Sequence, residues 1–234
     1  MSSLQHRSQQ LEIMDDLSCA GAVVNQTLRE LDFINQWLGG NAVTLQALRK
    51  VWGKSRKTSI AMADLGCGSG EMLRVIASHK SFRGISFQLY GWDANPNIIT
   101  YAREHCREFS NIQFFASNVF DSAFQSLRFD VTLATLFLHH FTNDEIVKLL
   151  LILKSNTSTA IVINDLHRHP LAYYSIWALT KLFSKSSMVK YDAPLSVARG
   201  FSRKEWVAIL KDAGIDRYEL NWRWAFRWQL IIWL

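Results

Sequence analysis

The feature that most constrains this chain is a run of alternating glycines, Gly66, Gly68 and Gly70, preceded by Asp64. An apolar segment, residues 60–63, comes before the glycines, and an amphipathic segment, residues 71–79, follows them. This order predicts a strand, a tight turn and a helix. Glycines let the main chain turn sharply and approach a ligand, and the first N–H groups of the helix face that ligand. The stretch therefore predicts a nucleotide pocket.

A second apolar segment, residues 85–92, ends in Asp93. In folds of this kind, an acidic side chain about 20 residues after the glycines accepts hydrogen bonds from the ribose hydroxyls. We therefore expect the carboxylate of Asp93 to hold a ribose, with Ala94 and Asn95 on the adenine side. The alternative is that Asp93 caps the helix that begins near Pro96.

The glycine spacing, G-x-G-x-G, differs from the G-x-G-x-x-G of nicotinamide and flavin sites. It resembles motif I of the class I S-adenosylmethionine (SAM)-dependent methyltransferases, usually written (D/E)-x-G-x-G-x-G, and Asp93 matches their second acidic position. The resemblance runs from about residue 60 to the C-terminus. It implies that SAM is the cofactor and that the binding loop comprises Asp64, Gly66, Cys67, Gly68 and Gly70. The alternative is that these glycines merely shape a loop.

The resemblance also implies cofactor contacts at two later strand ends. Asn118 and Val119 stand where the family often has an acidic and an apolar residue, and Asn118 can accept a hydrogen bond from the adenine amino group. Asparagine in a loop is also a common turn former. The backbone of Thr135 and Leu136 is expected to face the amino-acid end of SAM.

The histidine pair His139 and His140 resembles the Leu-His-His segment of ubiquinone/menaquinone-type and other small-molecule methyltransferases. Imidazole titrates near neutral pH and suits the removal of a phenolic proton, so either histidine is a candidate catalytic base. The alternative is that one of them only packs beneath the next helix. His167 and His169, together with Asn164 and Asp165, suggest a metal, since catechol-type O-methyltransferases hold magnesium with Asp and Asn near these strand ends. Thr135 stands where a further ligand is required, so hard oxygen donors are too few and we expect no metal site.

Residues 31–40 and 199–201 are similar to bacterial methyltransferases encoded beside type III polyketide synthases. This similarity implies a phenolic or quinone-like acceptor with an apolar tail. The aromatic segment 171–183 is the expected lid over such a lipidic or aromatic acceptor. We expect methylation of a hydroxyl group. C-methylation of an activated aromatic ring and a domain that binds SAM without catalysis are the alternatives.

The chain has 234 residues, of which 49% are hydrophobic and 20% are charged. This length and composition indicate a globular protein with one sizeable core. Its apolar stretches are far shorter than the roughly 20 residues of a membrane span, and its polar start lacks the core of a signal peptide. We therefore expect a cytoplasmic protein without stable membrane insertion. Its three cysteines form no C-x-x-C pair, which argues against zinc and disulfides.

The formal net charge of +6 raises nucleic acid as a partner. The basic cluster between residues 49 and 57 is nevertheless more typical of a solvated surface. The chain also lacks the (N/D/S)-P-P-(Y/F) motif and a cysteine beside proline, which two classes of nucleic-acid methyltransferase use. We expect a small-molecule acceptor, no nucleic acid, and a monomer or homodimer. An RNA methyltransferase is the weaker alternative.

Hydrophobic periodicity predicts an α/β fold, with a doubly wound, mainly parallel seven-stranded sheet like that of Rossmann-type methyltransferases. An N-terminal helical cap, residues 1–58, is expected before the SAM-binding domain, residues 59–234, with a helical insert at about 166–200 after strand five. The predicted helices are 11–17, 23–38, 44–52, 71–79, 96–106, 144–153, 171–183 and 203–213. The predicted strands are 60–64, 85–92, 112–116, 129–135, 159–164, 218–225 and 228–233. Residues 184–200 are expected to form a loop.

Overall fold

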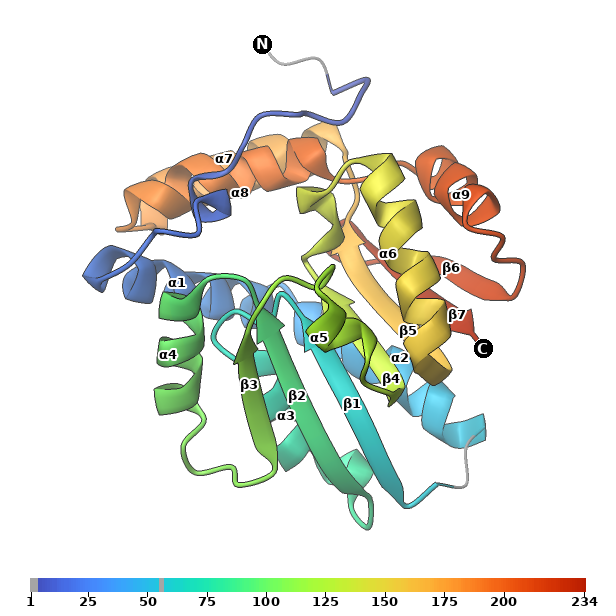
Figure 1. Cartoon of the computed structure of the whole chain (residues 1–234). Coiled ribbons are helices and arrows are strands. Elements are labelled where there is room, and N and C mark those ends of the chain that lie inside the picture. The colour runs from blue at the N-terminus through green and yellow to red at the C-terminus, as the bar shows by residue number, and fades with distance from the viewer. Residues whose placement is uncertain (1–3, 55–56) are drawn as a thin grey trace.

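The protein was analysed as a computed structural model, which describes residues 4–54 and 57–234. Residues 55 and 56 of the basic cluster and the first three residues of the polar start lie outside the described residues. A twisted sheet forms the middle of the molecule, with helices on both faces and a further group of helices across one end (Figure 1). This arrangement confirms the predicted doubly wound α/β fold.

The sheet has seven strands in the order β3-β2-β1-β4-β5-β7-β6. Their bounds are β1 Ser59–Leu65, β2 Ser86–Asp93, β3 Ile112–Ala116, β4 Phe129–Thr135, β5 Thr157–Leu166, β6 Tyr218–Arg223 and β7 Arg227–Trp233. Strands β1 to β5 are parallel, whereas β7 runs antiparallel between β5 and β6. The strand order reverses between β1 and β4, and ligands of open parallel sheets bind beyond the carboxyl ends of the strands at such a point.

Helices cover both faces of the sheet because its strands bury side chains on both sides. The α-helices are α1 Ala22–Trp37, α2 Gly40–Lys54, α3 Glu71–Ser78, α4 Pro96–His105, α5 Ser122–Gln125, α6 Asn143–Asn156, α7 Pro170–Phe183, α8 Ser187–Arg199 and α9 Arg203–Asp212. Along β1, Met62 faces the cluster with α2, α3 and α4, whereas Ala63 faces the cluster with α5, α6 and α9. This alternation is the two-residue period of a strand that is buried on both sides.

Helix starts carry their own sequence signals. Asn95 caps α4 by accepting hydrogen bonds from the N–H groups of Asn97 and Ile98, and Pro96 takes the first helical position. A capping box formed by Thr142 and Glu145 begins α6. These local signals explain why the bounds of α4 and α6 lie within a few residues of the predicted ones.

Two predicted segments are wrong. Residues 11–17 form only a short 3-10 turn, η1 Ile13–Asp15, because Glu12 and Asp15 direct their side chains to distant residues. Residues 184–200, expected as a loop, contain helix α8, in which Pro194 lies inside the helix. Pro194 and the polar residues around it interrupt the 3.6-residue period of hydrophobic side chains by which a helix is predicted. The predicted insert after strand five is therefore a pair of packed helices, α7 and α8.

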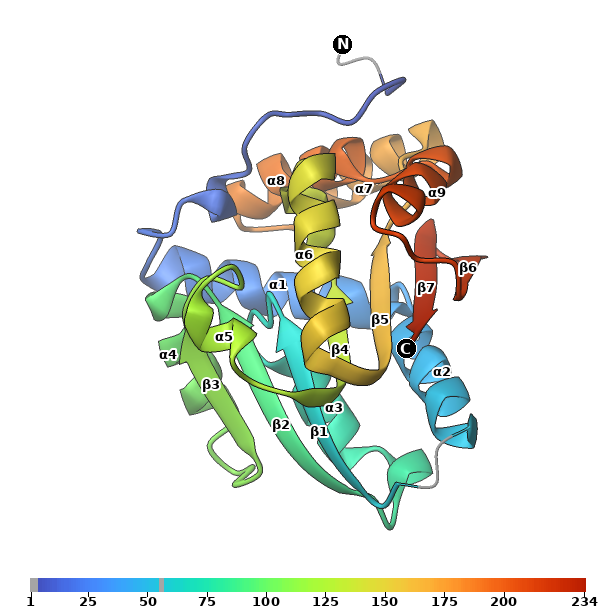
Figure 2. The ribbon, with the colours of Figure 1, turned by 45° about the vertical axis from the view of Figure 1, so that its right-hand side comes forward.

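The division of the chain into residues 1–58 and 59–234 stays a prediction. Helix α2 packs against β5 and β7 and so belongs to the layer that covers the sheet, whereas α1 crosses the carboxyl ends of the strands below α7 and α8 (Figures 1 and 2). Among the described residues, none of the helices combines the length and hydrophobicity required to cross a bilayer.

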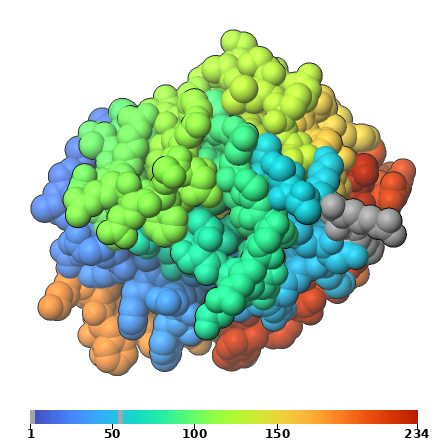
Figure 3. Space-filling model, turned by 90° about the horizontal axis from the view of Figure 1, so that it is seen from below, coloured from blue at the N-terminus to red at the C-terminus, as the bar shows by residue number. Residues whose placement is uncertain are grey.

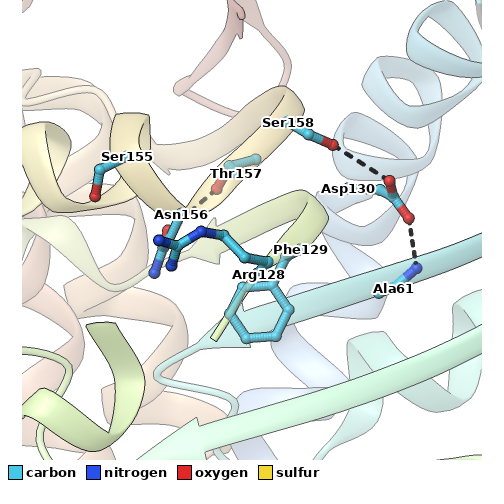
Figure 4. Close-up of a pocket in the computed structure, with 8 residues that line it drawn as sticks. All are labelled: Ala61, Arg128, Phe129, Asp130, Ser155, Asn156, Thr157 and Ser158. Atoms are coloured by element: carbon cyan, nitrogen blue, oxygen red, sulfur yellow. Dashed lines mark hydrogen bonds between the residues drawn. The ribbon is translucent and has the colours of Figure 1, made fainter. Parts of the chain in front are cut away.

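The opposite end of the molecule, seen from below in Figure 3, holds a small cavity of about 230 Å³ at the start of β4 and β5. In this cavity Asp130 accepts hydrogen bonds from the Ala61 N–H and from Ser158, so its carboxylate already has partners (Figure 4). Ligands of this sheet type bind at the carboxyl ends of the strands, so the functional site is expected at the other end of the molecule.

Candidate functional site

The glycine loop joins β1 to α3 in the predicted way. Gly66, Gly68 and Gly70 have φ of 62°, 52° and 75°, a region that favours glycine over other residues. A Cβ at Gly66 would lie 2.2 Å from the Phe137 ring, so the loop also needs glycine for close packing. The N–H of Cys67 donates to the carbonyl of Trp92 and ties the loop to the end of β2.

Asp93 lies at the end of β2 and faces this loop. Its Oδ2 accepts a hydrogen bond from the Gly68 N–H at 3.4 Å, and its Oδ1 accepts one from the Asn95 N–H at 3.0 Å. The cap of α4 is Asn95, so the alternative in which Asp93 caps that helix is wrong. Burial raises the pKa of Asp93 above its usual value. Asp93 thus places a carboxylate beside the glycine loop.

Asp64 is buried beneath the loop at the end of β1. Burial, with a smaller contribution from the nearby Asp93, raises its pKa to about 8. Its Oδ1 has no hydrogen-bond partner among the described residues. A buried carboxylate without partners costs free energy, and a cationic group on a ligand would reduce that cost.

Helix α1 covers the glycine loop, a contact that the sequence analysis missed. The Ser69 hydroxyl lies 2.8 and 2.7 Å from the two carboxylate oxygens of Asp32, and Leu28 packs over Gly68. Burial raises the pKa of Asp32 to about 6. The signal for this contact in the sequence is that Asp32, an acidic residue, stands four positions after Leu28 on a buried helix face.

Asn118 forms a turn after β3. Its side-chain oxygen accepts a hydrogen bond from the Phe120 N–H, and its own N–H donates to Asp121. Its side chain is exposed, whereas Val119 is buried. The structure therefore shows the turn-forming role of Asn118, and its contact with adenine stays a prediction.

Thr135 and Leu136 end β4 at the same edge of the sheet as the glycine loop. Leu136 has a φ of 53°, an uncommon conformation for a residue with a side chain, and its N–H donates to the carbonyl of Asn164 at 2.8 Å. The hydroxyl of Thr135 lies 3.3 Å from that of Thr44 in α2. This strained turn directs the backbone after β4 across the sheet edge.

His139 is buried between two carboxylates. Its Nδ1 lies 2.8 Å from Asp165 Oδ1, and its Nε2 lies 3.6 Å from Glu12 Oε1. Burial raises the pKa of Glu12 to about 7. Burial alone would also raise the pKa of Asp165, but His139 and backbone hydrogen bonds lower it below its usual value. The His139 side chain is only 3% exposed, so this ring is closed off from solvent.

His140 keeps 24% of its side chain exposed. Its Nδ1 lies 2.6 Å from Asp15 Oδ1, and Arg199 donates to the other carboxylate oxygen of Asp15. A carboxylate on Nδ1 fixes the orientation and the tautomer of the ring. Of the two predicted bases, His140 is therefore the more accessible one, and the roles of both stay predictions.

Ligand atoms of Glu12, His139 and His140 lie within 4.8 Å of one another, a spacing that a metal ion could bridge. Arg199 Nε is 3.9 Å from the Glu12 Oε1 of this group, so one of its carboxylates already faces a cation. His167 accepts a hydrogen bond from Trp222, and His169 caps α7. The expectation of no metal site stays a prediction.

A cavity of about 660 Å³ lies between α1 and α7. Its walls are mostly apolar, and its lining includes Phe33, Ile34, Trp37, Ile176, Leu179 and Phe183. Arg29, Glu30 and Lys185 also line it, and Glu30 accepts a hydrogen bond from Ser184 in the loop before α8. Residues of the predicted lid, Ile176, Leu179 and Phe183 among them, thus line a cavity of the size of a small ligand.

Comparisons with known proteins agree with this geometry. Residues 62–156 match the family model described as a methyltransferase domain. No protein with a curated description matches the chain significantly in sequence.

Many solved structures share the fold. The human N-acetylserotonin methyltransferase in complex with SAM is 17% identical with a TM-score of 0.61; the alignment covers 90% of this chain and 55% of that one. A SAM-dependent methyltransferase of Aquifex aeolicus is 17% identical with a TM-score of 0.61, over 88% of this chain and 96% of that one. A protein of Nostoc punctiforme with a suggested O-methyltransferase activity is 14% identical with a TM-score of 0.59, over 94% and 67%.

At these identities, the solved structures establish the fold alone. The segment that matches the family model contains the glycine loop, Asp93 and the end of β4. The chain thus contains a segment, residues 62–156, that matches a methyltransferase domain, within a fold that it shares with solved SAM-dependent methyltransferases.

Proposed function

We propose that the protein transfers the methyl group of SAM to a hydroxyl of a small aromatic, phenolic or quinone-like acceptor that carries an apolar tail. The observation that carries this proposal is the position of Asp93, whose carboxylate accepts a hydrogen bond from the glycine loop at the switch point of the sheet. The cofactor supplies an activated methyl group. The protein then has to align the acceptor, exclude water and accept one proton.

The cofactor site in this proposal spans the carboxyl ends of β1, β2 and β4. Gly66, Gly68 and Gly70 admit the adenosine close to the main chain, and Asp93 accepts hydrogen bonds from the ribose hydroxyls. The unpartnered oxygen of Asp64 suits the cationic amino group of the cofactor. Asn118 and Val119 lie on the adenine side, and Thr135 and Leu136 lie at the amino-acid end.

The acceptor site in this proposal is the cavity between α1 and α7. Its apolar wall fits a ring or an alkyl tail, and burial of such groups is favourable. Helix α1 joins the two sites, because Asp32 contacts the glycine loop whereas Phe33 and Trp37 line the cavity. This connection supports a small organic acceptor over a nucleic acid.

The proton acceptor in this proposal is His140, oriented by Asp15, and the reaction needs no metal. A phenol near neutral pH requires a base that titrates in the same range, and imidazole meets that requirement. His139 is buried behind it and supports its position. C-methylation of an activated ring is the second candidate, because a histidine base and an apolar cavity serve both reactions.

Product analysis tests the proposal. Purified protein is incubated with methyl-labelled SAM and a panel of alkylated phenols, and the products are analysed by mass spectrometry before and after ether cleavage. We expect a labelled methyl group that ether cleavage removes. A methyl group that resists cleavage would establish the C-methylation alternative, and labelling of RNA but of no phenol would contradict both.

A further inference from the structure

Arg227, the first residue of β7, is a buried cation that neither the fold nor the proposed reaction uses. Only 3% of the residue is exposed. Its Nε and Nη1 are fully buried and have no hydrogen-bond partner within residues 4–54 and 57–234. In the sheet it pairs with Leu166, at the carboxyl end of β5. The guanidinium therefore lies at the end of the sheet where the reaction is expected.

Burial of an unpaired charge is costly, and proteins normally supply a counterion. Burial lowers the pKa of Arg227 to about 10, and the one acid with an appreciable opposing effect is Asp165. The carboxylate of Asp165 is already bound by the His139 ring and by the N–H groups of Leu138 and Leu166. Among the described residues, Arg227 thus has no carboxylate of its own.

Gly40 and Asn35 form the surroundings of this guanidinium. A Cβ at Gly40 would lie 2.9 Å from Arg227 Cζ and 1.9 Å from Asn35 Oδ1. The three residues therefore pack closely at the junction between α1 and α2. The side-chain oxygens of Asn35 and Asn164 are also unpartnered. Amide oxygens can accept hydrogen bonds from a guanidinium, but they carry no net charge and leave the cation uncompensated.

This cluster adjoins the cofactor site. Asn35 lies three residues after Asp32, on the same face of α1, and Asp32 contacts Ser69 in the glycine loop. The amide of Asn35 donates to Asn41, whose amide donates to Glu71 at the start of α3. Hydrogen bonds and a shared helix face therefore connect the cluster to the glycine loop, and Arg227 connects it to the end of β5.

We propose that Arg227, together with Asn35 and Gly40, forms a binding site for the carboxylate of a small ligand. The inference rests on the proposed function, and two sources of the carboxylate fit it: the amino-acid end of SAM and an acidic group on the acceptor. Arginine suits this role because its planar fork matches a carboxylate with two parallel hydrogen bonds. The unpartnered Asp64 would complement the ammonium group if the carboxylate belongs to SAM.

Calorimetry with matched ligands tests the site. S-adenosylhomocysteine (SAH) is compared with its decarboxylated analogue, which keeps the amine and lacks only the carboxylate. Separately, 4-hydroxybenzoate is compared with its methyl ester in the presence of SAH. The proteins are the wild type, Arg227→Gln and Arg227→Lys. Arg223→Gln is the control, because Arg223 pairs with Arg227 across β6 and β7 but donates to Gln229.

If SAM supplies the carboxylate, the wild type binds SAH roughly 10- to 100-fold more tightly than the decarboxylated analogue, and Arg227→Gln loses this preference. If the acceptor supplies it, the same loss occurs between 4-hydroxybenzoate and its ester. Arg227→Lys keeps the charge but lacks the planar guanidinium, so its preference for the carboxylate should lie between those of the wild type and Arg227→Gln. Arg223→Gln should behave as the wild type.

Equal binding of all four probes by the wild type and Arg227→Gln would overturn the inference. The comparison of SAH with its analogue in the wild type needs no variant, so it remains informative if a substitution prevents folding. Failure of the wild type to bind SAH would contradict the proposed function instead. The carboxylate site would then be decided by 4-hydroxybenzoate and its ester without cofactor.

Discussion

The carboxylate of Asp15 lies 2.6 Å from Nδ1 of His140 and joins the N-terminal segment to the end of β4. Burial alone would raise the pKa of Asp15, but hydrogen bonds and charge from His140 and Arg199 lower it well below its usual value. Asp15 is therefore ionised over the working pH range and holds the His140 ring in place as a charged group. This relationship places a residue of the N-terminal segment next to the proposed base.

We expect Asp15→Asn to lower kcat about 10-fold or more, because the His140 ring loses the carboxylate that orients it. The Kd of SAH should stay unchanged, because Asp15 contacts His140 and Arg199 rather than the residues of the proposed cofactor site. Steady-state kinetics and calorimetry with SAH check this. An unchanged kcat would contradict the role of Asp15 in orienting the base.

Asp64→Asn is expected to stabilise the free protein at alkaline pH and to weaken SAH binding. The pKa of Asp64 is raised from 3.8 to about 8, so the folded state holds its proton more tightly than the unfolded state. The contribution of Asp64 to stability is therefore present at low pH and declines as the pH rises from about 4 to about 8.

Urea unfolding of wild type and Asp64→Asn at pH 5 and pH 8 measures this effect. The free energy of unfolding of the variant minus that of the wild type should be larger at pH 8 than at pH 5, by on the order of 1–3 kcal/mol. Equal differences at both pH values would show that Asp64 does not titrate in this range.

Leu179→Trp should reduce the space in the cavity between α1 and α7. We expect KM for a phenol with a long alkyl tail to rise about 10-fold, whereas KM for a short phenol and the Kd of SAH stay unchanged, because the tail loses its apolar contacts. Leu182→Trp is the control, since Leu182 is 74% exposed and does not line the cavity. Similar effects of both substitutions would contradict the assignment of the cavity.

Removal of metal ions by prolonged dialysis against EDTA should leave kcat and the melting temperature unchanged. The carboxylates around His139 and His140 already face cations, Arg199 among them, and no step of the proposed reaction requires a Lewis acid. Activity assays with and without added Mg²⁺ and Zn²⁺ check this. Recovery of lost activity by one of these ions would assign a metal to Glu12, His139 and His140.

Local signals explain which parts could be predicted from the sequence. The glycine loop, Asp93 and the seven strands could be predicted from residues that are close together in the sequence. Alternating glycines indicate the loop, and hydrophobic residues that recur every 2 or 3.6 positions indicate strands and helices. The helix expected at 11–17 failed because Glu12 and Asp15 are committed to residues more than 100 positions away. Helix α8 was missed because the buried Pro194 interrupts its pattern.

The site residues that were missed have long-range partners. Asp32 acquires its role through Ser69, and Arg227 through Asn35 and Gly40, and none of these pairs is close in sequence. Asp165 was considered only as a metal ligand, and its contact with His139 depends on the adjacency of β4 and β5. Such pairings follow from the sheet topology, which a reading of local pattern does not supply.

Titration of SAH into the wild type and Asp93→Asn, followed by calorimetry, tests the central claim most directly. If Asp93 accepts hydrogen bonds from the ribose as a charged group, as we propose, the wild type binds SAH and the variant loses roughly 10- to 100-fold in affinity. Asp144→Asn, at an exposed acid in the first turn of α6, is the matched control and should bind as the wild type. Absence of heat with SAM and SAH in the wild type, together with a clear signal for NADH, would contradict the account.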